Sequence, residues 1–127
     1  MNVKLDTKEK FTVITPEEAE ITANMTVELQ QLLDSFKIKD IPHLVFNFDQ
    51  VKKIDEATLQ MIVKQQQEFY NDNNSFVICG LNESITKTLD EKDCLDVMNI
   101  TPTESEAWDI VQMEEIEREL MRDFDNN

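Results

Sequence analysis

The apolar segment 44–48 and the helical pattern that follows it constrain the fold more than any other part of the sequence. Four of its five residues are apolar, which is typical of a central strand covered on one face of a sheet. Asp49 follows this segment directly, and Asp55 stands directly before an amphipathic pattern over 56–70. Because the N-terminus of a helix leaves backbone N–H groups free, this junction predicts a surface that a partner or an anionic modification can use.

Hydrophobic periodicity along the rest of the chain predicts an alternation of strands and helices. We expect strands at 3–5, 11–14, 19–21, 44–48, 75–79 and 95–100, and helices at 25–36, 56–70, 83–90 and from 104 onward. Strands separated by helices favour right-handed crossovers. The order therefore predicts an α/β fold with a four- to five-stranded mixed β-sheet and about four helices, the last one extended. The length of 127 residues fits one domain with a single core.

Side chains that cap helices or face the core support these helices. Asn24 or Thr26 is expected to cap the first helix, Asn82 the third, and Thr103 the fourth, where Glu106 follows three residues later as in a capping box. The second helix is expected to bury one face, formed by Leu59, Ile62, Val63, Gln66, Phe69 and Tyr70.

The last predicted helix carries an apolar stripe and a strong negative charge. Between 104 and 127 the sequence has nine acidic residues and two arginines. The stripe recurs at helical spacing and consists of Met113, Ile116, Leu120 and Phe124. Two interpretations stay open: a long helix packed on its own sheet, or a stripe presented to a partner or to a second copy of the chain. We assign residues 1–111 to the domain and 112–127 to an acidic C-terminal helical extension.

The charge balance excludes several classes of partner. The chain has 27 acidic and 12 basic residues, a formal net charge of −15. Such a surface repels nucleic acid and anionic membranes. No apolar run has the length of a membrane span, and the N-terminus lacks the pattern of a signal peptide. We therefore expect a cytoplasmic protein that binds no nucleic acid and does not insert directly into a membrane.

Residues for catalysis or for binding a metal are sparse. The single glycine excludes a glycine-rich phosphate loop, and the single histidine, His43, has no partner cluster of metal-ligand spacing. Asp49 and Asp55 alone are a weak cation site. Cys79 lies in an apolar run and is expected to be a small buried residue. The sequence thus predicts no enzyme, no metal and no cofactor.

The order of elements and several segments together resemble the STAS domain, the module shared by anti-sigma factor antagonists and the tails of sulfate transporters. The similarity extends over about residues 3–111. It lies in Leu44–Val51, Ile54–Asp55, Ser75–Asn82, Ile85–Leu89, Cys94–Leu95 and Thr101–Ala107. The resemblance implies a protein-interaction module that works in signalling or transcription regulation.

In anti-sigma factor antagonists the junction before the second helix usually has the sequence Asp-Ser-Ser/Thr-Gly-Leu-Gly. A kinase that is also the anti-sigma factor phosphorylates the residue directly after the aspartate, and the added charge prevents binding. By position, Asp55 matches that aspartate and Glu56 matches the phosphorylated residue. The two family glycines are replaced by Thr58 and Gln60, which add side chains where the family exposes backbone.

The resemblance implies a switch site that consists of Asp55, Glu56, Ala57 and Thr58. Glutamate accepts no phosphate but carries a constant negative charge, about half of that of a phosphoserine. Glu56 is either a favourable first residue of the helix, a switch fixed in its modified-like state, or part of a surface that no longer uses the switch. Thr58 is a possible phosphosite.

The expected partner is an anti-sigma factor or a similar regulatory protein, bound in partner switching. Two alternatives stay open: an accessory subunit of a membrane transport assembly, which docks through the last helix, and a domain that binds a nucleotide or another small molecule. A homodimer through the C-terminal helix is also possible.

Overall fold

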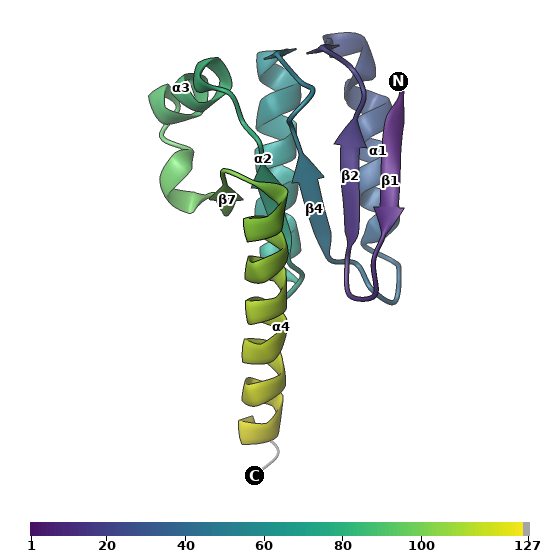
Figure 1. The fold of residues 1–127 in the computed structure, drawn as a ribbon, viewed down its shortest axis with the longest axis vertical. Coiled ribbons are helices and arrows are strands. Elements are labelled where there is room, and N and C mark those ends of the chain that lie inside the picture. Colours follow the sequence, from purple (N-terminus) through teal and green to yellow (C-terminus); the bar gives the residue numbers. More distant parts are fainter. Residues whose placement is uncertain (126–127) are drawn as a thin grey trace.

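The computed structural model describes residues 1–125, with side chains placed through Arg122. Its strands are β1 (Val3–Thr7), β2 (Thr12–Pro16), β3 (Glu20–Ile21), β4 (Leu44–Asn47), β5 (Lys53–Ile54), β6 (Phe76–Cys79) and β7 (Ile100–Thr101). Its helices are α1 (Thr26–Phe36), α2 (Glu56–Asn71), α3 (Glu83–Glu91) and α4 (Glu104–Asp125), with 3₁₀ turns η1 (Ala23–Met25) and η2 (Leu95–Val97). Figure 1 shows α4 running along the sheet and projecting beyond it.

The main sheet has five strands in the order β1-β2-β4-β6-β7. β1 and β2 form an antiparallel hairpin, whereas β2, β4, β6 and β7 pair in parallel. The predicted α/β fold with a mixed sheet of four to five strands, four helices and a long last helix is confirmed. The segment 19–21 pairs outside this sheet, because β3 forms a separate parallel ribbon with β5, a strand that the sequence pattern does not reveal.

Both faces of the sheet are covered, so the expectation of a strand covered on one face only is wrong for β4. Along β4, Leu44 and Phe46 belong to the core that α1, α2 and α3 cover. Val45 belongs to a second, smaller core with Ala107 and Val111 of α4. All four residues of β4 are buried, which is the burial expected of a strand in a parallel sheet between two layers of helices.

The predicted last strand over 95–100 is wrong for most of its length. Residues Leu95–Val97 form η2, and only Ile100–Thr101 pair with β6. Leu95 and Met98 both pack against the main core. Their spacing of three residues is that of a helical turn, in which the intervening Val97 points to solvent with 61% of its surface exposed.

Two predicted details of the helices also need correction. Neither Asn24 nor Thr26 caps α1, because η1 leads into the helix and no side-chain cap forms at Met25. Tyr70 is 71% exposed, whereas Gln65 is buried. The buried face of α2 is therefore rotated towards Gln65, whose amide donates to Asp34 Oδ1 of α1 at 2.9 Å. The predicted caps Asn82 and Thr103 are confirmed.

The helix α4 is continuous across the predicted boundary between 111 and 112. Among the side chains of α4 that are described, those of Ala107 and Val111 are buried, and the apolar ones from Met113 to Met121 are largely exposed. The extension predicted for 112–127 is thus the outer part of one helix as far as Asp125. The side chain of Phe124 lies outside the described residues. Among residues 1–125, no helix is long and apolar enough to cross a membrane.

Candidate functional site

The switch site lies where the chain passes from β4 to α2. After β4, Phe48 and Val51 are buried and hold the connection against the core. Lys52 is fixed through its backbone, whose N–H donates to Ala19 O at 2.7 Å and whose carbonyl accepts from Asn82 Nδ2 at 2.9 Å. The start of α2 is therefore held by β3 on one side and by the cap of α3 on the other.

Asp55 caps α2 and organises its first turn. Its Oδ2 accepts from the backbone N–H of Thr58 at 3.1 Å and from the Thr58 hydroxyl at 3.2 Å. Its own N–H donates to Ile21 O of β3 at 2.8 Å. A side-chain cap of this kind satisfies one of the free N–H groups of the helix and stabilises the helix by about 1 kcal/mol.

Thr58 is fully buried beneath this turn. Its hydroxyl also forms a short hydrogen bond with the Thr26 hydroxyl of α1. Thr58 therefore joins the first turns of α1 and α2, which its sequence position did not suggest. The hydroxyl meets no solvent, so modification of Thr58 would require the first turn of α2 to open. The phosphosite at Thr58 stays a prediction.

Glu56 and Ala57 are the exposed members of the site. The Glu56 Oε1 atom lies 2.6 Å from Lys92 Nζ, and 56% of the Glu56 side chain is accessible to solvent. Lys92 is the C-cap of α3. The hydrogen bond with Glu56 raises the pKa of Lys92. Sequence reasoning missed this partner, because no local spacing connects Lys92 with the start of α2.

An open groove of about 500 Å³ runs beside the capped turn. Its walls are the β3–β5 ribbon, the start of α2 and one side of α3, represented by Lys53, Asp55, Glu56, Ser84 and Thr88. The groove places both lysine and carboxylate groups next to the helix N-terminus. Such a mixed polar rim on a rigid support suits contact with a protein surface.

The loop that leads into the site packs tightly against Gly80. Gly80 has φ +74°, and a Cβ atom there would lie 2.2 Å from Asp49 Oδ1. The Asp49 N–H donates to Asn47 Oδ1 at 2.8 Å, and Asn47 Nδ2 donates to Glu104 at 3.1 Å. The ends of β4 and β6 are thereby tied to the first turn of α4.

The described residues hold no assembled metal site, and Cys79 is not an activated thiol. Within residues 1–125, no group of three or more histidine, cysteine or acidic side chains is arranged to hold a metal ion. Burial raises the pKa of Cys79 to about 12, so this thiol stays protonated and unreactive near neutral pH. The expectation that Cys79 is a buried core residue is confirmed.

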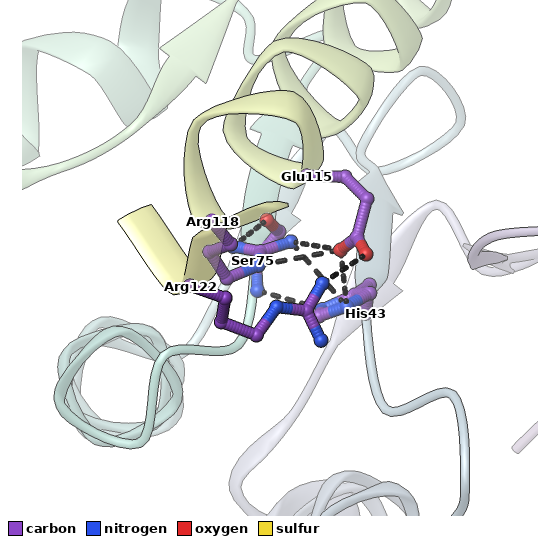
Figure 2. Close-up of polar contacts among 5 residues, drawn as sticks. All are labelled: His43, Ser75, Glu115, Arg118 and Arg122. Atoms are coloured by element: carbon purple, nitrogen blue, oxygen red, sulfur yellow. Dashed lines mark hydrogen bonds and ion pairs between the residues drawn. The ribbon is translucent and has the colours of Figure 1, made fainter. Parts of the chain in front are cut away.

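His43 takes part in a separate polar cluster at the opposite end of the sheet. Figure 2 shows Glu115, Arg118 and Arg122 of α4 directed at His43 and Ser75. Arg118 donates to Ser75 Oγ at 3.1 Å and to Glu115 Oε2 at 2.9 Å. His43 Nδ1 accepts from the Ser75 N–H at 3.0 Å. This cluster attaches the outer part of α4 to the strands.

Comparisons with solved structures place this geometry in a known fold. A candidate anti-sigma factor antagonist from Thermotoga maritima aligns with a TM-score of 0.78 at 19% identity, covering 87% of this chain and 94% of that chain. Moorella thermoacetica RsbS carrying a serine-to-glutamate substitution aligns with a TM-score of 0.73 at 16% identity, covering 88% and 96%. The murine anion transporter Slc26a9 aligns with a TM-score of 0.67 at 11% identity, covering 82% of this chain and 18% of the transporter.

At these identities the structural likeness shows the fold alone. No curated protein matches the sequence significantly. The family assignment rests on the sequence itself, because residues 2–107 match the family model of the STAS domain. That match spans most of the chain and includes β4, the switch site and the first turn of α4. The protein belongs to the STAS domain family.

Proposed function

We propose that this protein is a non-enzymatic protein-interaction module that acts in partner switching, in signalling or transcription regulation, and that it docks its partner on the switch site. The observation that carries the proposal is the position of Glu56. This exposed carboxylate occupies the first residue of α2, where the resemblance to anti-sigma factor antagonists puts the phosphorylated residue.

The charge of Glu56 is constant, which distinguishes it from a phosphorylated serine. A carboxylate in the first turn of a helix interacts favourably with the helix dipole, and no phosphatase can remove it. Lys92 balances part of the charge at 2.6 Å. The surface is therefore in one state throughout, and the partner recognises Glu56, Ala57 and the adjoining groove.

The rigidity of the turn supports the same proposal. The Asp55 cap and the hydrogen bond between Thr58 and Thr26 hold the backbone beneath Glu56. Preorganised surfaces lose less conformational entropy on binding than flexible ones. The partner is a regulatory protein of the anti-sigma factor type or one that resembles it.

The test is affinity capture from the native cells, with quantitative mass spectrometry of the bound proteins. Wild type is compared with Glu56→Lys and with the matched control Glu106→Lys, which reverses an exposed charge in the first turn of α4. We expect a specific protein that wild type and the control retain and Glu56→Lys loses. Equal recovery by all three variants would contradict the switch site as the docking surface.

A second candidate function is an accessory subunit of a membrane transport assembly. The observation in its favour is the shared fold with a region of Slc26a9. In that case the acidic outer part of α4 docks on a basic subunit. Deletion of 112–127 should then abolish co-purification with a transport protein from solubilised membranes, whereas Glu56→Lys should leave it unchanged.

A further inference from the structure

The outer part of α4 exposes apolar side chains on the face turned away from the sheet. Met113 and Ile116 are each 56% exposed, Leu120 is 63% exposed and Met121 is 61% exposed. We call Met113, Ile116 and Leu120 the outer stripe. Their spacing of three and four residues follows one helix face, and the buried residues Ala107 and Val111 lie on the opposite face. Three large apolar side chains in succession on a solvent-exposed face are typical of a binding surface.

The helix that bears the stripe is held in place from its other side. Arg118 reaches Ser75 and Glu115, and Glu115 Oε2 lies 3.3 Å from His43 Nε2 (Figure 2). These contacts continue the attachment of α4 beyond Val111, the last residue of α4 that is buried among the side chains described through Arg122. The stripe is thus presented on a fixed support, not on a free tail.

The exposed charges that α4 itself places around the stripe are of one sign, whereas Lys8 and Lys10, between β1 and β2, line the hollow beside Ile116 and Glu119. Asp109, Glu117 and Glu119 lie three or four residues from its members along the helix and are exposed. The two arginines of α4 lie elsewhere: Arg118 contacts Ser75, and both Arg118 and Arg122 pair with Glu115. A second copy of this helix would bring acidic rims together, which is unfavourable.

A groove of about 680 Å³ runs along one side of the stripe, between α2 and α4. Met113, the exposed Tyr70 and the exposed Val97 contribute to its apolar lining, and its charged residues are all acidic: Asp96, Glu114 and Glu117. The groove combines apolar contacts with carboxylates that call for positive charge. Amphipathic helices bind in grooves of this composition through their apolar face.

We propose that the outer stripe and this groove form a second docking surface, and that its occupant is a basic amphipathic helix of a partner protein. Leucine-type side chains of that helix cover Met113, Ile116 and Leu120, and its flanking lysines or arginines face Glu117 and Glu119. The surface is separate from the switch site, since no residue of the stripe lines the groove beside Asp55. The two surfaces therefore bind different segments of partner proteins.

The test uses a synthetic helical peptide of about three heptads with leucine at the a and d positions and lysine at e and g. A matched peptide carries glutamate in place of lysine. Calorimetric titration measures binding of each peptide to the full chain. We expect the lysine peptide to bind wild type and to bind an Ile116→Asn, Leu120→Asn double variant at least about tenfold more weakly, because each buried apolar side chain contributes about a tenfold factor or more. Charge reversal by Glu117→Lys should also weaken binding.

Three results would overturn the proposal: no binding of the lysine peptide to wild type, equal binding of the glutamate peptide, or equal binding to the double variant. A concentration series in the analytical ultracentrifuge tests the other possible occupant, a second copy of the chain. A wild-type dimer that the double variant dissociates would show that a second copy covers the stripe, and would also overturn it. The substituted side chains are exposed, so circular dichroism should show unchanged folding. Glu56→Lys serves as the control for the switch site and should bind the peptide like wild type.

Discussion

Glu56 and Lys92 join the first residue of α2 to the C-cap of α3 by an ion pair of 2.6 Å. Glu56 lines the groove beside Asp55, and its pairing with Lys92 partly balances the negative charge at the switch site within the domain itself. A docking partner meets this pair and not an isolated carboxylate. Removal of Lys92 therefore changes the charge of the site without changing Glu56.

We expect Lys92→Ala to alter partner recovery while leaving the fold intact. Both side chains of the pair are about half exposed, and exposed pairs contribute little to stability because water and salt screen them. The urea midpoint of Lys92→Ala should lie close to that of wild type. The amount of partner protein captured from cell extract should change. A large drop of the midpoint would instead mean that the pair holds α3 against α2.

Thr58 should behave as a structural residue of the junction. Thr58→Val keeps the shape but removes the hydroxyl, so Thr26 loses its hydrogen-bond partner and Asp55 loses one donor. We expect a loss of about 1 kcal/mol in the free energy of unfolding, because Thr26 and Asp55 are only partly buried and Asp55 still accepts from the Thr58 N–H. Thr58→Ser retains the hydroxyl and should lose less. Urea denaturation of both variants measures the difference, and equal losses would assign the effect to packing alone.

Burial of Thr58 also bears on phosphorylation, since a kinase needs the hydroxyl outside the first turn. Native protein analysed by intact mass and peptide mapping should therefore carry no phosphate on Thr58. A phosphorylated Thr58 peptide would show that the first turn of α2 opens in the cell and that the switch acts two residues after the family's position.

The strands and helices of this domain were predictable wherever a segment has strong periodicity or a capping side chain. β4, β6 and the caps Asn82 and Thr103 follow from apolar runs and from residues that satisfy helix N–H groups. η2 differs from the predicted strand because Leu95 and Met98, which pack on the core, are three residues apart, and the apolar but exposed Val97 between them hides this helical spacing. β5 was missed because its two residues, Lys53 and Ile54, pair with β3 from a distant part of the chain.

The positions of the site residues in the sequence were predictable, but the residues that they contact were not. The sequence places Asp55 and Glu56 at a helix start, and local capping geometry then follows. The contacts with Thr26 and Lys92 depend on how α1 and α3 pack beside α2. Tertiary packing of this kind leaves no local pattern, so the sequence predicts Thr26 only as a possible helix cap and does not connect Lys92 with the site.

Gly80 should tolerate no side chain. Its φ of +74° disfavours residues other than glycine, and an added Cβ would meet Asp49 Oδ1 at 2.2 Å. We expect Gly80→Ala to lower the free energy of unfolding by at least about 1–2 kcal/mol, the backbone cost alone. Combining it with Asp49→Ala should relieve the contacts with the Asp49 side chain, and leave the backbone cost and the approach to the Asp49 backbone N at 3.0 Å. Chemical denaturation of the single and double variants checks this, and a Gly80→Ala variant as stable as wild type would contradict it.

Deletion of 112–127 should leave a folded domain. Ala107 and Val111, the residues of α4 in the second core, remain in the shortened chain. The deletion removes Arg118 and its contact with Ser75, so some loss of stability is expected. A single cooperative unfolding transition by circular dichroism would support the boundary between 111 and 112. Loss of that transition would show that the outer part of α4 is required for folding.

Stability should decline as the pH falls below neutrality, and His43 should account for this. Burial and the neighbouring Arg118 hold the pKa of His43 below its ordinary value of 6.5, although Glu115 opposes them. The unfolded chain then binds more protons than the folded one between the two pKa values. The contribution of His43 to stability is therefore complete above about pH 6.5 and is lost as the pH falls through the folded pKa. Protonation of Nδ1 would also remove the acceptor of the Ser75 N–H. Urea midpoints across this range measure the effect. His43→Asn, which keeps an acceptor but does not titrate, should flatten the dependence; an unchanged slope would assign the titration to other groups. Asp34 and Glu115 have lowered pKa values, so their contribution is lost only in more acidic solution.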